Sequence, residues 1–159
     1  MFAASLVERL LEAAPVARLA QIDDRGNAQA LPFVFVRLAD ALWSPVDGKA
    51  KRHARLSRLT WIAERPEVCV LVDHYGEDWS QLWWLKLYCH AEIFRENHPQ
   101  WNQAVAALSK KYAQYADISL FSGNPTMIRL QWREWKSWAA GGVTSVEAWL
   151  AAEKTARWR

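Results

Sequence analysis

The sequence predicts an α+β protein built on a mainly antiparallel sheet of about six strands, with helices inserted between hairpins. Apolar runs rich in β-branched residues come in pairs joined by turn residues, as at 16–22 and 28–36 around Asp23–Asn27. Stretches with helical apolar spacing lie between these pairs instead of alternating with single strands. A closed or nearly closed barrel is the arrangement that best hides the edges of such a sheet.

The first half of the chain predicts a helix, a hairpin and a short third strand. A helix is expected over about residues 3–13, because apolar residues recur at helical spacing ahead of Pro15: Leu6, Val7, Leu10 and Leu11. The runs 16–22 and 28–36 predict the hairpin, and residues 41–44 the third strand. Pro32 cannot donate to a strand ladder, so it indicates an edge, a bulge or a surface left open for something to pack on.

The second half supplies the remaining elements. In order they are a helix at 52–64, a strand at 68–72, a strand at 82–94, a helix opened by Asn97 and Pro99, a strand at 126–138 and a short final helix. Pro66 prevents the helix at 52–64 from continuing. Thr144 and Glu147 have capping-box spacing and predict the start of the final helix.

Length and charge restrict the classes of function. With 159 residues, 52% of them hydrophobic, the sequence predicts one domain over residues 1–159. A formal net charge of +3, from 20 basic and 17 acidic residues, does not suggest a protein built to neutralise a nucleic-acid backbone. No apolar run approaches the roughly 20 residues of a membrane-spanning helix, and the start of the chain lacks a signal-peptide pattern. We therefore expect a cytoplasmic protein with neither a nucleic-acid nor a membrane partner.

The usual catalytic and metal-binding residue patterns are missing from the sequence. Cys69 and Cys89 lie inside apolar runs, where a thiol packs as a small hydrophobe, so no disulfide is expected. The histidines and cysteines lack zinc-ligand spacing, and no metal site is expected. Three carboxylates in one hairpin connection are best explained as solvated groups: Asp73, Glu77 and Asp78. No Ser-His-Asp, P-loop or dinucleotide-binding pattern is present.

Tryptophan is unusually abundant, with 11 residues, several of them gathered in the stretches 79–84 and 132–138. Such clusters fill a core, line a ligand pocket or form a subunit interface, and composition does not choose among these outcomes.

A dense group of cations lies between the third strand and the second helix. Ser44 is followed by Lys49, Lys51 and Arg52, and further arginines occupy the first helical turns. A helix start with free N–H groups, cations and a hydroxyl suits a phosphate group. The alternative is a solvated basic surface. Cations at a helix start oppose the helix dipole, and a bound anion would offset that opposition.

Five stretches together resemble the pyridoxamine 5′-phosphate oxidase-like family of FMN-binding split barrels, in particular its branch of probable coenzyme F420-dependent enzymes. These stretches are residues 17–20, 31–34, 46–52, 66–75 and 77–84. The resemblance implies a split β-barrel homodimer with two cofactor sites at the subunit interface. The cofactor expected from it is FMN, with coenzyme F420 as the alternative.

The resemblance also implies roles for individual residues. Pro32, Phe33 and Val34 would face the ring system of the cofactor. The phosphate would be held by four residues: Ser44, Lys49, Lys51 and Arg52. Three tryptophans would approach from the partner subunit: Trp79, Trp83 and Trp138.

Three functional hypotheses follow. The first is a flavin- or deazaflavin-dependent oxidoreductase that transfers hydride to or from a small organic substrate, with no side chain required as catalyst. The second is a protein that binds flavin, F420 or haem without turnover. The third uses the cations and tryptophans to bind single-stranded nucleic acid.

Overall fold

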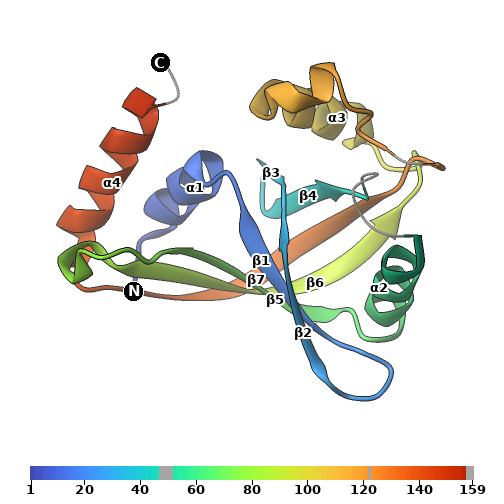
Figure 1. The fold of residues 1–159 in the computed structure, drawn as a ribbon, viewed down its shortest axis with the longest axis horizontal. Coiled ribbons are helices and arrows are strands. Elements are labelled where there is room, and N and C mark those ends of the chain that lie inside the picture. The colour runs from blue at the N-terminus through green and yellow to red at the C-terminus, as the bar shows by residue number, and fades with distance from the viewer. Residues whose placement is uncertain (47–51, 122, 157–159) are drawn as a thin grey trace.

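In the computed structural model, residues 1–46, 52–121 and 123–156 are described, and for 52–56 and 154–156 the description covers the backbone alone. This part of the chain forms one seven-stranded sheet with four α-helices around it (Figure 1). The strands are β1 (Ala17–Ile22), β2 (Ala28–Phe33), β3 (Val36–Leu38), β4 (Ala41–Pro45), β5 (Glu67–His74), β6 (Trp83–Phe94) and β7 (Met127–Ala139). The helices are α1 (Ala4–Ala13), α2 (Arg52–Glu64), α3 (Trp101–Lys111) and α4 (Gly142–Ala156), with 3₁₀ turns η1 (Trp79–Gln81) and η2 (Ala113–Ala116).

The strand order brings the two edges of the sheet together. The order is β2-β1-β5-β6-β7-β4-β3, and the paired neighbours run antiparallel. The outermost strands, β2 and β3, are consecutive in the chain and are separated only by Val34 and Phe35. Two linking residues span little distance, so the sheet curls until its edges meet there. We call Val34–Phe35 the seam of this open barrel.

The α+β class and the antiparallel sheet are confirmed, but the strand count of six is wrong. The single strand expected at 28–36 is divided into β2 and β3 by the seam. Pro32 lacks an N–H, and the N–H of Phe35 donates to the hydroxyl of Tyr112 at 3.0 Å instead of to a neighbouring strand. Pro32 does lie in an edge strand, one of the positions its sequence allowed.

The β1–β2 hairpin is closed by the side chain of Asp23. Its carboxylate accepts hydrogen bonds from the backbone N–H groups of Arg25 and Asn27 at 2.9 and 2.8 Å, and from Gln29 Nε2 at 2.9 Å. Gly26 takes the left-handed conformation that this turn needs, with φ of 84°. The expected hairpin therefore has a local cause in its turn residues.

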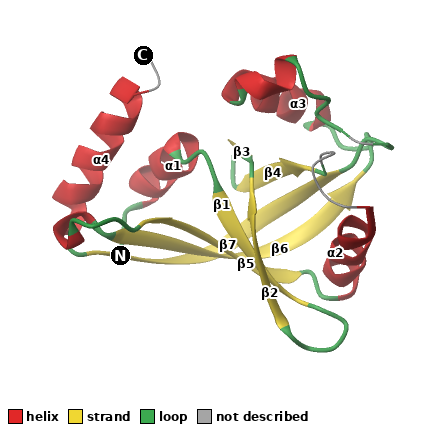
Figure 2. Ribbon diagram, viewed as in Figure 1, coloured by secondary structure: helices red, strands yellow, loops and turns green. Residues whose placement is uncertain are grey.

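Helices α1 and α4 pack beside each other, and with α3 they lie on one side of the long antiparallel pair of strands β6 and β7 (Figure 2). The predicted apolar stripe of α1 is its buried face. The predicted start of α4 is wrong, because the helix begins at Gly142 and Thr144 lies inside its first turn. Glu147 is bonded to another helix. Its carboxylate accepts two hydrogen bonds from Arg9 of α1, at 2.7 and 2.5 Å.

Two buried clusters form the interior. The larger one lies between the sheet and helices α1, α2 and α4, and the smaller one lies under α3 around Trp43, Trp101 and Tyr112. None of the described helices combines the length and the apolar character needed to span a bilayer.

Candidate functional site

The three residues expected to face a cofactor ring lie at the end of β2 and at the seam. Pro32 is exposed, Val34 is half-buried and Phe33 is buried with 8% of its surface accessible. Because β2 is an edge strand, this short segment borders a part of the sheet where no further strand is paired. The exposed proline on an edge leaves a surface on which a flat ligand could pack.

Ser44 is brought to the same region by β4. Trp43 pairs with Val36 of β3, so Ser44, the next residue of β4, lies alongside the seam. Its side chain is buried, with 6% of the residue surface accessible. The β3–β4 pairing thus brings Ser44 close to the Pro32–Val34 segment, although Pro32 and Ser44 are 12 positions apart in the sequence.

The cations predicted to bind phosphate follow Ser44 in the chain. Lys49 and Lys51 lie outside the described residues. Arg52 begins α2, and its side chain is likewise outside the described part. Their role in phosphate binding remains a prediction from the sequence.

Tyr112 fixes the geometry of the seam, a role that the sequence analysis missed. Its hydroxyl accepts from the Phe35 N–H at 3.0 Å, and its hydrogen lies between the carbonyl oxygens of Phe35 and Pro15, both 2.9 Å away. The hydroxyl therefore serves as the hydrogen-bond partner of the N–H and the carbonyl oxygen of Phe35, in place of a neighbouring strand. A tyrosine directly after an amphipathic helix was the only signal available for it in the sequence.

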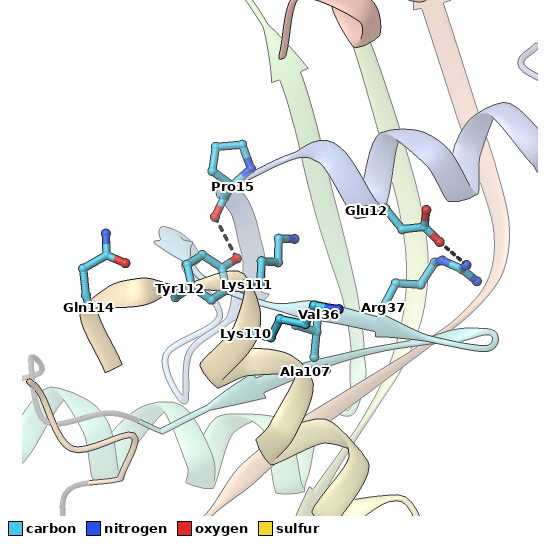
Figure 3. A pocket seen from close by; sticks show the side chains of 9 residues that line it. All are labelled: Glu12, Pro15, Val36, Arg37, Ala107, Lys110, Lys111, Tyr112 and Gln114. Atoms are coloured by element: carbon cyan, nitrogen blue, oxygen red, sulfur yellow. Dashed lines mark hydrogen bonds and ion pairs between the residues drawn. The ribbon is translucent and has the colours of Figure 1, made fainter. Parts of the chain in front are cut away.

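A groove of about 720 Å³ lies against β3, between the end of α1 and the end of α3 (Figure 3). Pro15, Val36 and Ala107 supply an apolar floor, and Tyr112 lines the groove next to the seam. Cationic side chains complete it, from Arg37 of β3 and from Lys110 and Lys111 of α3. The volume lies in the range of small-molecule sites, roughly 300–1,000 Å³.

The three tryptophans implied by the resemblance lie in different environments. Trp79 on η1 is 77% exposed and Trp138 on β7 is 44% exposed. Trp83 has no accessible surface, and its ring packs edge-on against Trp149 of α4 with centroids 4.8 Å apart. Trp83 is therefore a core residue with no surface available to another molecule.

The side of β6 and β7 that faces away from the larger core carries aromatic and cationic side chains, together with Glu134 opposite Tyr88 and, on β5, Asp73, which lies opposite Trp84 and is paired with Arg18. In the register, Trp84 lies opposite Trp138, and Lys86 lies opposite Lys136. Neither lysine forms an ion pair with a described residue, although each lies over an aromatic ring, Lys86 over Trp84 at 5.5 Å and Lys136 over Tyr88 at 5.7 Å. We call this the outer face: Trp84, Lys86, Tyr88, Lys136 and Trp138.

The titratable groups of the described residues do not form a nucleophilic or metal-binding centre. Burial raises the pKa of Cys89 to about 12 and also raises the pKa of Cys69, so both free thiols are protonated at neutral pH. A hydrogen bond from His90 lowers the pKa of Glu67, and the two side chains are 2.8 Å apart. No group of three or more metal-binding side chains is found among the described residues.

Comparison with solved structures identifies the fold. No family model and no curated protein sequence matches the chain. The haem storage protein HutZ of Vibrio cholerae superposes with a TM-score of 0.66 at 17% identity, over 87% of this chain and 95% of that one. An FAD-binding protein of Mesorhizobium loti gives 0.64 at 19% identity, over 86% and 92%. A pyridoxamine 5′-phosphate oxidase-like protein of Listeria innocua gives 0.59 at 18% identity, over 84% and 95%.

The chain has the split-barrel fold of the pyridoxamine 5′-phosphate oxidase-like proteins. The resemblance seen in the sequence is thereby confirmed at the level of fold. In this split barrel the seam is the point at which the sheet opens, and the candidate ring-binding residues, Ser44 and the groove all border it. Proteins of the same fold include flavin-binding and haem-binding members, so the fold supports cofactor binding as a class of function.

Proposed function

We propose that this protein binds a flavin-type cofactor, FMN or coenzyme F420, and uses it to transfer hydride to or from a small organic substrate. The observation that carries the proposal is the convergence at the seam of an edge segment, Pro32–Val34, with Ser44 and the strand that leads into the basic turn. A planar ring system packs on the exposed Pro32 and the half-buried Val34, and Ser44, Lys49, Lys51 and Arg52 hold the phosphate.

The residues present fit such a cofactor in their chemistry. Lysine and arginine just before and at a helix start, with the serine of the preceding strand, are donors that match a phosphate group, and the positive charge of the cations is best accommodated there by a bound anion. When bound, the cofactor supplies the hydride chemistry itself. The chain binds and orients it, and the apolar walls around the seam exclude water.

A second copy of the chain completes the site in this proposal. The outer face exposes Trp138 next to half-buried Trp84, and it places two lysines directly opposite each other without a carboxylate partner among the described residues. Like charges on opposing strand positions destabilise a sheet, and a covering subunit with acidic groups would relieve the repulsion. Exposed Trp79 would then lie over the partner's cofactor.

Non-catalytic binding of haem is the second candidate, because the haem storage protein HutZ shares the fold. The residues assigned to the ring system favour a flavin-type ligand over haem, since none of Pro32, Phe33 and Val34 has a side chain that ligates iron. The hydroxyl of Tyr112, another potential iron ligand, is already bonded to backbone groups.

The absorption spectrum of the purified protein tests these candidates. FMN, F420 and haem have distinct visible bands, and the proposal predicts a flavin or deazaflavin spectrum, either as purified or after incubation with FMN or F420. Reduction of the bound ligand followed by reoxidation with candidate acceptors then tests turnover. A haem spectrum, or failure to retain either flavin-type ligand, would contradict the proposal.

A further inference from the structure

The groove beside the seam combines an apolar floor with an excess of positive charge. Three of its nine described lining residues are cations, Arg37, Lys110 and Lys111, whereas Glu12 is the one carboxylate among them (Figure 3). The C-terminal dipole of α3 favours lysines in its last turn. It does not explain why these lysines border a concave apolar surface large enough for a small molecule.

Arg37 is held rigidly on the β3 side of the groove. Its guanidinium donates to the carboxylate of Glu12 and, at 3.0 Å, to the carbonyl oxygen of Ala39, and Glu8 lies 3.9 Å away. Only 18% of its side chain is accessible. Its charge is matched by these acids, so Arg37 shapes the wall instead of supplying the main attraction for a ligand.

Lys111 is also fixed in place. Its ammonium group donates to the carbonyl oxygen of Leu11 at 3.3 Å, near the end of α1, and lies 4.2 Å from the ring centroid of Phe35. These contacts hold a positive charge against the seam side of the groove at little further entropic cost on ligand binding.

Lys110 is the exposed cation among the residues that line the groove. It is exposed and forms no ion pair with a described residue. It lines the same groove as the apolar side chains of Val36 and Ala107. An anionic group at Lys110 would thus allow an attached apolar body to cover the floor, which removes apolar surface from water.

We propose that this groove binds a small organic anion, a carboxylate or phosphate ester with an apolar or aromatic body, and that Lys110 recognises its charge. None of the described residues that line the groove was assigned to the cofactor, and binding to the groove does not depend on a cofactor. If the proposed function also holds, the position of the groove against the seam makes this anion the substrate.

The test is an NMR titration of the full-length, ¹⁵N-labelled protein with benzoate, phenyl phosphate and the neutral benzamide. Saturable amide shifts at Val36, Ala107 and Gln114 are expected with the two anions, and weaker binding with benzamide. Preference for benzoate or for phenyl phosphate tells whether a carboxylate or a phosphate ester is recognised. Lys110→Glu should weaken anion binding by about tenfold, as expected when one charge contact is lost and replaced by repulsion.

Arg95→Glu is the matched control, because it changes the net charge equally from an exposed position that precedes α3, whereas Lys110 is near its other end. Anion binding to Arg95→Glu should remain within about twofold of the wild type, since only a screened, distant charge differs. Equal weakening by both variants, equal affinity for benzamide and benzoate, or amide shifts confined to other surfaces would overturn the proposal. A flavin titration of the same variants reports on the proposed function separately.

Discussion

The hydroxyl of Tyr112 bonds both backbone groups of Phe35, accepting from its N–H at 3.0 Å and lying 2.9 Å from its carbonyl oxygen. Because the same hydroxyl reaches Pro15, one side chain joins the end of α3, the end of α1 and the seam. The candidate ring-binding surface and the groove share this support.

Tyr112→Phe should lower the free energy of unfolding by about 1–3 kcal/mol, because the buried N–H of Phe35 loses its acceptor. Chemical denaturation measures the change. Tyr75→Phe, at a side chain 64% exposed, is the control and should have almost no effect. Equal stability of the Tyr112 variant and the control would show that the seam does not depend on this hydroxyl.

Substitutions of Trp83 and Trp79 should distinguish an effect on stability from an effect on cofactor binding. Trp83→Ala creates a cavity beside Trp149 and should cost about 3–5 kcal/mol of unfolding free energy. Trp79→Ala, at an exposed position, should change stability by less than about 0.5 kcal/mol and weaken flavin binding. If Trp79→Ala binds flavin as the wild type does, Trp79 has no place in the cofactor site.

Asp23 should make hairpin stability depend on pH. Its pKa is lowered chiefly by the backbone hydrogen bond from Asn27, with further lowering by the bonds from Gln29 and Arg25. The ionised carboxylate therefore stabilises the fold above its unfolded pKa of about 3.9, and this contribution disappears as the pH falls through the lower folded pKa. Asp23→Ala should be destabilised relative to the wild type at neutral pH, and the difference should shrink in acid.

The exposed Asp24, next in the chain, provides the comparison for this measurement. Denaturation of Asp24→Ala should match the wild type at every pH. A destabilisation by Asp23→Ala that is the same at neutral and acidic pH would exclude the ionised carboxylate as its cause.

Replacement of Trp138 should separate the subunits. Trp138→Arg adds a third cation to the outer face beside Lys86 and Lys136 and removes an exposed aromatic surface. Light scattering should show twice the chain mass for the wild type and the mass of one chain for the variant. A wild-type protein that is monomeric at all concentrations would contradict the proposed interface.

Local sequence signals were sufficient for most elements. Helix α2 is found at its predicted residues 52–64, because Pro66 limits it, and the turn at Asp23 produced its hairpin. The division at Val34–Phe35 could not be predicted, since it depends on Tyr112, which is 77 positions further along the chain than Phe35. Glu147 likewise bonds Arg9, which is 138 positions away in the chain.

In the candidate site, too, features with a local sequence signal could be predicted, and features that depend on distant contacts could not. Pro32 carried its own signal, since a proline in an apolar run already indicates an edge. The burial of Trp83 had no such local signal, because strand alternation and the packing of α4 decide which of two adjacent tryptophans is buried. The groove is formed by α1, β3 and α3, so no single stretch of sequence could reveal it.

Phosphate binding by the basic turn is tested by a flavin titration of Lys51→Ala, monitored by quenching of flavin fluorescence. Loss of one charged phosphate contact should weaken FMN or F420 binding by about 1.5–3 kcal/mol, or roughly 10- to 150-fold in Kd. Arg25→Ala removes an exposed cation at the β1–β2 turn and should bind as the wild type does. Unchanged affinity in Lys51→Ala, or an equal loss in both variants, would contradict phosphate binding by the basic turn.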